Sequence, residues 1–444
     1  MAPIAVEVPP EATPIVGKAV EVAAEATPAA AEEVQPAPEA APTTVPDVEP
    51  VPEATAAVVE DAAVVPEAAA VAVAEAQVAS EETPAMEEPA QTHFTYTGPL
   101  KSSGSLDAYE HFDVTPVIGR EFPKANLVEL LEAPNSDELI RDLAITISER
   151  GVVFFRAQDN LTNDLQKKLI LRLGELTGRP KTSGLHIHPV LNSERELGGN
   201  DLEISTISSE QNKKLYRARG AKDGQSTKGQ NRSQWHSDIA FEPVPADYSS
   251  LRLVQLPRTG GDTLWASGYE VYDLLSEPYQ KFLETLSVTF EQPGFAAAAE
   301  RNGFKLYDKA RGAPENIGSI LKAVHPVVRT NPVTGWKSIF PVGGHVSHIN
   351  DVTEEESKHL LEWFLSLVHT NHDVQVRLKW QNPNDIAIWD NRSVFHTATF
   401  DYDNEGDRFG NRAVGLGERP FFDTNSTSRR EALGQEVPRR FRGV

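Results

Sequence analysis

Residues 384–396 read NDIAIWDNRSVFH, and this stretch decides the class of fold that the sequence predicts. Within it, DIAIWDN carries a strand signature, with the apolar residues IAIW between polar ones. Four further segments carry strand signatures: GVVFFRAQ at 151–158, SSLRLVQL at 249–256, VQVRLKWQ at 374–381 and RAVGLGERPFF at 412–422. Their irregular spacing argues against a parallel sheet built from regular βα units.

Two segments predict helices inserted before and among these strands. NSDELIRDLAITISERG opens with Asn135 and Glu138 as a capping pair, and TEEESKHLLEWFLSLVHT opens with Thr353 and Glu356 in the same relation. Both segments then repeat apolar residues at helical spacing. The predicted fold is therefore mainly β with inserted helices, a double-stranded β-helix (jelly roll) core decorated by α-helices.

The first ninety residues differ in composition from the rest of the chain. They contain 18 acidic residues, Lys18 as the single basic residue, and no Trp, Tyr, Phe or Arg. Frequent prolines interrupt any long helix, and such a composition buries too little apolar surface to fold. We therefore predict a disordered acidic tail, rich in Ala, Pro, Glu and Val, over residues 1–92, and one catalytic domain over residues 93–444.

Bulk properties exclude several classes of function. The chain has no cysteine, which excludes disulfides, thiol nucleophiles and Cys-ligated zinc or iron–sulfur sites. It is acidic overall, so neither nucleic acid nor an anionic membrane is expected as a partner. It has no run of about 18 apolar residues, no secretory signal pattern and no phosphate-binding glycine loop. A cytoplasmic, soluble protein is expected.

Two HxD tripeptides occur in the chain, and each could place a histidine and an aspartate on one metal ion. We interpret His111 and Asp113, in YEHFDVTPVIG, as a surface or packing match. His236 and Asp238 stand in RSQWHSDIAF, at 232–241, between Trp235 and an apolar run. In a strand, residues two apart share a face, so this pair could hold an ion from one side.

A reactive iron site needs one more imidazole, because it uses two histidines and one carboxylate on one face of an octahedron. His396 is the best candidate, since it comes just after the apolar strand segment DIAIWDN. Arg408 and Arg412 come shortly afterwards, and a guanidinium near an open metal site suits a carboxylate or a sulfonate. These residues together predict a metal site that binds anions.

With these residues in place, the sequence resembles the iron(II)- and 2-oxoglutarate-dependent taurine dioxygenase family. The resemblance runs from about Val117 to Phe422. It rests on six blocks in order: GLHIHPV at 184–190, WHSDIAF at 235–241, GGDTLWASG at 260–268, HPVVRTNPVTG at 325–335, NDIAIWDNRSVFH at 384–396 and the pair Arg408/Arg412.

The resemblance implies a role for each matching residue. The implied iron(II) ligands and catalytic residues are His236, Asp238 and His396. The implied contacts to 2-oxoglutarate (alpha-ketoglutarate) are Thr263 and Arg408, with Arg412 meeting either this co-substrate or the anionic group of the substrate. The implied substrate-binding residues are His188, Ile239 and Phe241, with Arg412 again. Molecular oxygen is the implied second co-substrate.

The implied pocket departs from the pattern of the taurine enzyme. Leu191 stands where a tyrosine is expected, Arg232 replaces an asparagine, and His345 replaces a phenylalanine and joins the substrate-binding set. These changes remove partners for a small amine and add positive charge. They argue against taurine itself and for a different or larger anion.

The resemblance therefore implies hydroxylation of a small anionic organic substrate, with an alkyl sulfonate as the first candidate. Hydroxylation of the carbon that bears a sulfonate would release sulfite and leave an aldehyde. The alternatives are the same chemistry on an aryloxyalkanoate, a sulfate ester or a purine, or a jelly-roll ligand-binding protein without catalysis. Self-association into a homo-oligomer stays open.

Overall fold

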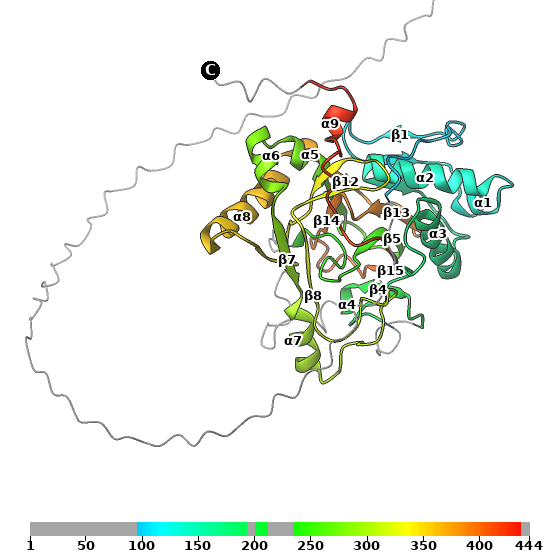
Figure 1. The fold of residues 1–444 in the computed structure, drawn as a ribbon. Helices are drawn as coiled ribbons and strands as arrows, with labels where there is room; N and C mark the ends of the chain where they lie inside the picture. The colour runs from blue at the N-terminus through cyan, green and yellow to red at the C-terminus, as the bar shows by residue number, and fades with distance from the viewer. Residues whose placement is uncertain (1–95, 193–199, 212–233, 437–444) are drawn as a thin grey trace, which may run out of the picture. The chain divides into compact units, whose positions relative to one another are not determined.

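The computed structural model describes residues 96–192, 200–211 and 234–436. The predicted acidic tail, 1–92, and Arg232 lie outside these residues. Within them, helices are interspersed among strands that pair mostly antiparallel (Figure 1). No helix in the described ranges is both long enough and apolar enough to cross a membrane.

A seven-stranded sheet runs through the domain in the order β1-β2-β3-β13-β5-β15-β4. Its neighbours pair antiparallel except β2 and β3, which are parallel. The strands span Phe112–Asp113 (β1), Arg120–Phe122 (β2), Val152–Phe155 (β3), Ile204–Ser208 (β4), Ala246–Gln255 (β5), Asp385–Asp390 (β13) and Phe409–Leu416 (β15).

A three-stranded sheet, in the order β12-β6-β14, faces the inner side of the large sheet. Its strands are Thr263–Ser267 (β6), Gln375–Leu378 (β12) and Val394–Ala398 (β14). Side chains from both sheets meet in one apolar cluster, which includes Phe154, Leu251, Trp265 and Trp389. After residues 391–393 the chain passes from β13 of the large sheet to β14 of the small one.

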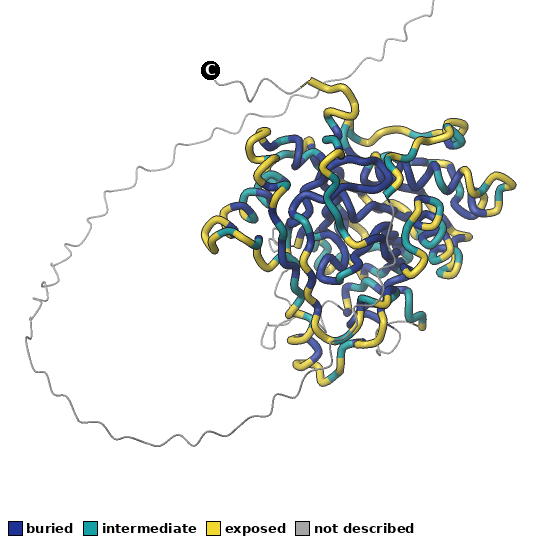
Figure 2. Tube along the Cα trace, in the orientation of Figure 1, coloured by how far each residue is buried: buried dark blue, intermediate teal, exposed yellow. Residues whose placement is uncertain are grey.

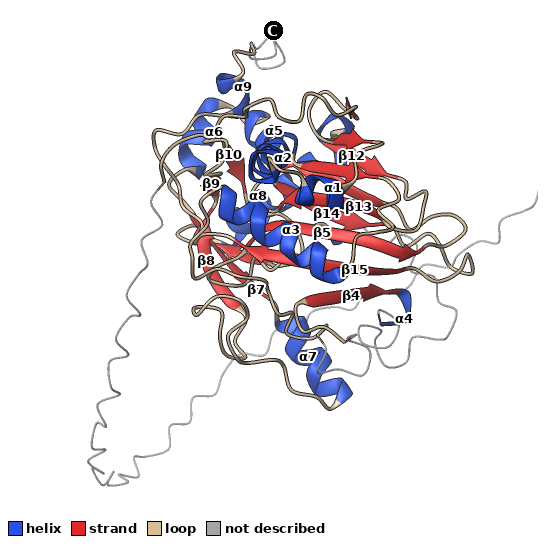
Figure 3. Ribbon diagram, turned by 90° about the vertical axis from the view of Figure 1, so that its right-hand side faces the viewer, coloured by secondary structure: helices blue, strands red, loops and turns tan. Residues whose placement is uncertain are grey.

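Three helices cover the outer side of the large sheet: α1 (Leu127–Glu132), α2 (Ser136–Arg150) and α3 (Asn163–Leu176). Alternate residues of the sheet face them, such as Ile386 and Ile388 of β13, while Ala387 and Trp389 face inward. Figure 3 shows α3 lying along β5 and β15. Every residue of β3 and β13 is buried, and their residues VVFF and IAIW form continuous apolar runs. Figure 2 shows the buried interior of the domain in dark blue.

Most of the remaining elements, apart from α4 and α9, pack around a further apolar cluster beside the small sheet. They include a sheet in the order β11-β7-β8 and the pair β10-β9. The strands are Ser287–Glu291 (β7), Lys322–Pro326 (β8), Val328–Thr330 (β9), Lys337–Ile339 (β10) and Val346–Ile349 (β11). The helices are Ser209–Gln211 (α4), Gly268–Asp273 (α5), Glu277–Leu283 (α6), Pro293–Asn302 (α7), Glu354–Thr370 (α8), His372–Val374 (η3) and Arg429–Ala432 (α9).

Most predicted elements are confirmed, with two corrections. Thr353 and Glu356 form the predicted capping box of α8, but the side chain of Asn135 makes no capping hydrogen bond to α2. The last predicted strand begins earlier and ends earlier than its sequence pattern indicated, at Phe409–Leu416. Arg412 therefore lies in the middle of β15 and not at its start.

Candidate active site

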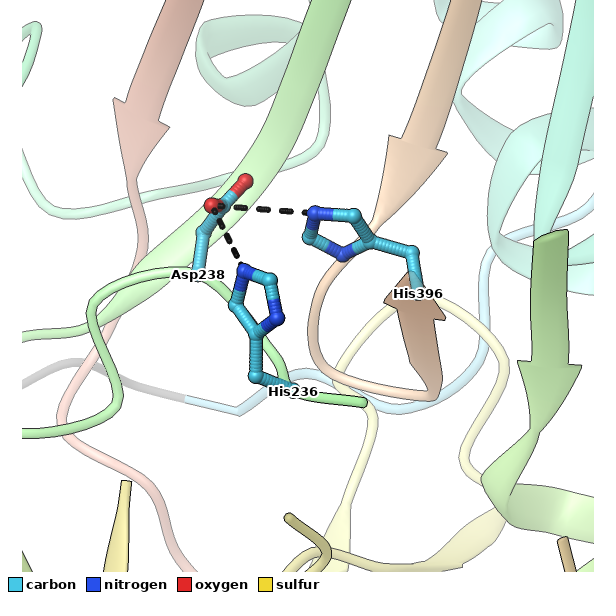
Figure 4. A group of neighbouring side chains, drawn as sticks. All are labelled: His236, Asp238 and His396. Carbon is cyan, nitrogen blue, oxygen red and sulfur yellow. Dashed lines mark ion pairs between the residues drawn. The ribbon is translucent and has the colours of Figure 1, made fainter. Parts of the chain in front are cut away.

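Three side chains that are far apart in the sequence converge in the structure. Oδ1 of Asp238 lies 3.9 Å from Nε2 of His236 and 4.0 Å from Nε2 of His396, as Figure 4 shows. One ligand atom from each residue falls within 4.8 Å of the other two. Across the described parts of the chain, no other three His, Cys, Asp or Glu side chains are grouped in this way.

Backbone hydrogen bonds fix the two histidines against each other. The N–H of His396, in β14, donates to the carbonyl of His236 at 2.8 Å, and the N–H of His236 donates back at 3.1 Å. The two imidazole centroids are 4.3 Å apart. The main chain therefore fixes the spacing of the two backbone positions from which these rings extend.

The segment that carries His236 and Asp238 is not a strand, so the predicted strand spacing is wrong. His236 forms an isolated bridge, Asp238 begins a turn, and Ile239 has a φ of 48°. Gly343 makes this path possible, because a Cβ there would overlap the carbonyl oxygen of Trp235. The turn, and not strand alternation, brings the carboxylate beside the imidazole.

The protonation states suit metal binding. Nδ1 of His236 lies 2.7 Å from the carbonyl of Gln234, so it carries the ring proton and leaves the Nε2 lone pair toward Asp238. Burial lowers the pKa of His236, and burial together with His236 lowers the pKa of His396 to about 3. Burial alone would raise the pKa of Asp238, but Arg412 and the two histidines hold it well below its usual range. The group is two neutral imidazoles and one carboxylate.

Asp238 is held at both carboxylate oxygens. Ser249 of β5 donates to Oδ2 at 2.8 Å, and Nη1 of Arg412 donates to Oδ1 at 2.5 Å. Nε of Arg412 is buried with no hydrogen-bond partner among the described residues. Arg412 thus compensates the charge of Asp238 and keeps one donor unused.

Arg408 and Thr263, the two contacts to 2-oxoglutarate that the resemblance implied, lie within hydrogen-bond distance of each other. Nη2 of Arg408 lies 3.3 Å from Oγ1 of Thr263, which also accepts from Nε1 of Trp380 at 3.2 Å, and Nε of Arg408 donates to the carbonyl of Gly261 at 2.9 Å. Burial lowers the pKa of Arg408. Asp262 acts on this pKa in the opposite direction, but no carboxylate of the described residues forms an ion pair with the buried guanidinium.

The strand register places this guanidinium pocket beside the three converging residues. His396 of β14 pairs with Trp265 of β6, and Thr263 is two residues before Trp265. Residues two apart on a strand share a face, so Thr263 is a diagonal neighbour of His396 on the inner face of the small sheet.

His188 is buried near the charged groups and is a neutral donor. Its Nδ1 accepts from the backbone N–H groups of Val190 and Leu191, at 3.0 and 2.9 Å. The ring proton therefore sits on Nε2. Burial and the charge of Arg412 hold the pKa of His188 well below its usual range.

His345 is oriented by the cap of a helix. Oε1 of Gln292, the N-cap of α7, accepts from the N–H of Gly294 at 3.1 Å, so Nε2 of Gln292 faces Nδ1 of His345, at 2.7 Å. Nδ1 of His345 then accepts, and the ring proton sits on Nε2. Burial, with His236 next, lowers the pKa of His345 to about 3.

Aromatic rings connect these two histidines. The ring of His345 lies 5.2 Å from that of His236 and 5.2 Å from that of Phe241. Phe295 of α7 lies 5.7 Å from Phe241 and 5.0 Å from His188. The structure therefore brings Phe241 into the same aromatic cluster as both histidines. Ile239, which directly follows Asp238, is buried in the same apolar core as Phe241.

The other HxD tripeptide has a different environment. Asp113, at the exposed edge strand β1, forms an ion pair with Arg120 at 2.7 Å, and Nδ1 of His111 lies 2.8 Å from the carbonyl of Tyr109. Neither residue belongs to a metal-binding group within the described chain. The interpretation of this tripeptide as a packing match is consistent with its contacts.

Sequence reasoning missed four polar residues that support the site: Ser249, Asn391, Gln292 and Trp380. Each acts through a hydrogen bond to a predicted residue. Ser249 and Asn391 could have been suspected, because polar residues inside buried strand segments need a partner.

Comparison with known proteins agrees with this geometry. A family model described as "Taurine catabolism dioxygenase TauD, TfdA family" matches residues 110–414. The chain is 50% identical over 341 residues to the alpha-ketoglutarate-dependent dioxygenase btcD of Neocamarosporium betae, covering 75% of this chain and 98% of that protein. The protein is therefore an enzyme of the 2-oxoglutarate-dependent dioxygenase class.

The chain is also similar to more distant proteins of the same class. An alpha-ketoglutarate-dependent sulfonate dioxygenase of Saccharomyces cerevisiae is 31% identical over 310 residues, 70% of this chain and 67% of that protein. The fold matches a solved taurine dioxygenase from Burkholderia xenovorans with a TM-score of 0.50 and 24% identity, over 70% of this chain and 90% of that one. The chain belongs to the TauD/TfdA family.

Proposed function

We propose that His236, Asp238 and His396 hold iron(II) and are the catalytic centre of this dioxygenase. The observation that carries the proposal is their convergence within 4.8 Å, as two neutral imidazoles and one carboxylate. This donor set suits non-haem iron and leaves coordination positions for other ligands. When bound, iron(II) supplies oxygen activation, in which 2-oxoglutarate and O2 become succinate and CO2 while one oxygen atom enters a C–H bond of the substrate.

Arg408 and Thr263 are the proposed anchor for 2-oxoglutarate. Arg408 is a buried guanidinium without a carboxylate partner in the described chain, and such a charge is costly unless an anion pairs with it. A carboxylate of 2-oxoglutarate would supply that anion and could accept from both side chains. The diagonal position of Thr263 beside His396 leaves the keto-acid end within reach of the metal ligands.

We assign the seven-stranded sheet and the β12-β6-β14 sheet to the two halves of a double-stranded β-helix within a catalytic domain of residues 93–444. The apolar cluster shared by the two inner faces supports this assignment.

The substrate is proposed to be a small anionic organic molecule, with an alkyl sulfonate as the first candidate. Three N–H groups are available to donate hydrogen bonds to an oxyanion of the substrate: Nε2–H of His188, Nε2–H of His345 and the unused Nε–H of Arg412. Phe241 supplies an apolar wall. The sulfonate dioxygenase among the relatives supports this choice at 31% identity, whereas the name of the 50%-identical relative specifies no substrate.

The metal assignment is tested by anaerobic addition of iron(II) and 2-oxoglutarate, followed through the visible absorption band that the pair gives when bound together. Asp238→Ala is expected to remove the band. The matched control is Asp113→Ala, which deletes the carboxylate of the other HxD tripeptide and should leave the band unchanged. An undiminished band in Asp238→Ala would show that the ligand assignment is wrong.

The substrate assignment is tested by succinate release over a panel of alkyl sulfonates, aryloxyalkanoates, sulfate esters and purines, with sulfite measured in parallel. Equal amounts of succinate and sulfite with an alkyl sulfonate are expected. Succinate formation with another anion and none with any sulfonate would replace the sulfonate assignment while leaving the dioxygenase chemistry intact.

A further inference from the structure

Asp238 is held through its main chain as well as its carboxylate. Besides the hydrogen bond from Ser249 to Oδ2, its backbone N–H donates to Oδ1 of Asn391 at 3.0 Å. Asn391 follows β13 and Ser249 lies on β5, so two strands of the large sheet meet at this carboxylate. All three residues are buried.

The orientation of the Asn391 amide is determined by its neighbours. Its Oδ1 accepts from the indole N–H of Trp389, at 2.9 Å, as well as from Asp238. Its Nδ2 must therefore face the other side, where it donates to Oγ of Ser249 at 2.8 Å and to the carbonyl of Asp247 at 3.1 Å. Every donor and acceptor of this amide is used.

The amide in turn determines the direction of the Ser249 hydroxyl. Since Oγ of Ser249 accepts from Asn391, its own proton is free to point only toward Oδ2 of Asp238. That bond occupies Oδ2, whereas Oδ1, which also accepts from Arg412, is the oxygen that faces the imidazoles of His236 and His396. Trp389 also packs against His396, with ring centroids 4.9 Å apart.

We propose that Ser249 and Asn391 are positioning residues that select which oxygen of Asp238 binds the metal. The inference rests on the proposed iron centre. Partners of this kind fix the orientation of metal ligands, and their loss lowers metal affinity about 10- to 100-fold. Neither residue touches the metal, so the effect should appear in metal binding before any turnover.

The first test compares Ser249→Ala with Ser250→Ala. The two serines are neighbours on β5, both are buried, and they face opposite sides, because Oγ of Ser250 accepts from Gln166 of α3 at 3.0 Å. Anaerobic titration with iron(II) alone, followed by chelator competition, gives the dissociation constant. Ser249→Ala is expected to bind about 10- to 100-fold more weakly than wild type, and Ser250→Ala as tightly as wild type.

A second variant tests whether Asn391 directs the Ser249 hydroxyl toward Asp238. Asn391→Asp keeps the acceptor for Trp389 and Asp238, but its second oxygen would accept the Ser249 proton and divert it from Asp238. It should weaken iron(II) binding as Ser249→Ala does, and the double variant should bind no more weakly than Ser249→Ala. Thermal melting without metal reports whether each variant folds; if Asn391→Asp does not, the two serine variants decide.

The outcomes separate this inference from the proposed function. A Ser249→Ala protein that binds iron(II) as tightly as Ser250→Ala would overturn the positioning role and leave the metal centre standing. A wild-type protein that binds no iron(II) would overturn the metal centre, and the positioning role with it.

Discussion

Arg408 and Arg412 are four residues apart and both are buried, yet they differ in what they contact. Arg412 has a carboxylate partner within the chain, Asp238. Among the described residues, the side chain of Arg408 donates to two neutral acceptors, the carbonyl of Gly261 and Oγ1 of Thr263. A buried charge without a counter-ion costs several kcal/mol, so the structure tolerates Arg408 best when an anion is bound.

Arg408→Gln is expected to raise the KM for 2-oxoglutarate about 10- to 100-fold, because a hydrogen-bonded charge pair contributes about 1.5 to 3 kcal/mol. Iron(II) affinity should stay unchanged. Succinate release at varied 2-oxoglutarate measures the effect. Arg258→Gln, at an exposed pair with Glu405, is the matched control. An unaltered KM for 2-oxoglutarate would place the co-substrate elsewhere.

The candidate site was predictable from the sequence to the extent that its residues stand in recognisable patterns. His236, Asp238 and His396 stand in such patterns, and the structure brings them together. Ser249 and Asn391 do not, because a serine or asparagine acquires a role only through a partner that is distant in the sequence. Their hydrogen bonds to Asp238 and to each other depend on strand register.

At the scale of secondary structure, the order of apolar and polar residues predicted those helices and strands in which this order follows burial. The apolar strands β3 and β13 and the helix α8 were predicted because their side chains record which face is covered. The path of His236 and Asp238 was not. Two long-range contacts determine the path of that segment: the bridge from His236 to His396 and the close approach of Gly343 to Trp235. Such contacts produce no periodic pattern of apolar residues in the sequence.

The N-terminus of α7 offers a prediction at this scale. Gln292→Glu keeps the acceptor for the Gly294 N–H but replaces the amide donor that faces Nδ1 of His345. The carboxylate requires a proton on Nδ1, so a neutral His345 loses its Nε2–H donor. We expect a raised KM for the substrate found in the panel, by about tenfold, with an unchanged KM for 2-oxoglutarate.

Kinetics with both compounds varied measure this separation. Gln280→Glu, on α6, is the control, because its amide donates to the carbonyl of Tyr272 away from the site. Equal KM values for the substrate in wild type and Gln292→Glu would contradict a donor role for His345.

At the scale of the whole molecule, three apolar clusters share the described chain, and the site lies where two of them meet. Phe395 belongs to the cluster beside the small sheet, while Val394 and Trp389 belong to the cluster between the sheets. His396 follows directly in the same strand. The sequence predicted β-sheets with inserted helices, but which strands pair could not be read from it, because pairing depends on contacts between distant segments. The predicted tail, 1–92, stays a prediction.

A buried carboxyl group in this interior should make stability depend on pH. Burial raises the pKa of Asp247 to about 6, against about 3.9 in an unfolded chain. A raised pKa favours the folded state fully below about pH 4, and that contribution is lost as the pH rises through about 6. Between about pH 4.5 and 7.5 the wild type should lose about 2 kcal/mol of unfolding free energy relative to Asp247→Asn.

Denaturant unfolding of both proteins across this pH range measures the difference. Because every other group titrates alike in the two proteins, only the relative slope matters. Parallel stability curves would mean that Asp247 is charged in the folded protein at neutral pH.

The reciprocal main-chain hydrogen bonds between residues 236 and 396 have a consequence for ion choice. Side chains can adapt to a larger or smaller ion by turning, but two peptide groups tied to each other cannot move apart without breaking the bridge. The backbone would then determine which ionic radius the site prefers. Substitution of nearby side chains would change how tightly an ion binds more than it changes which ion binds.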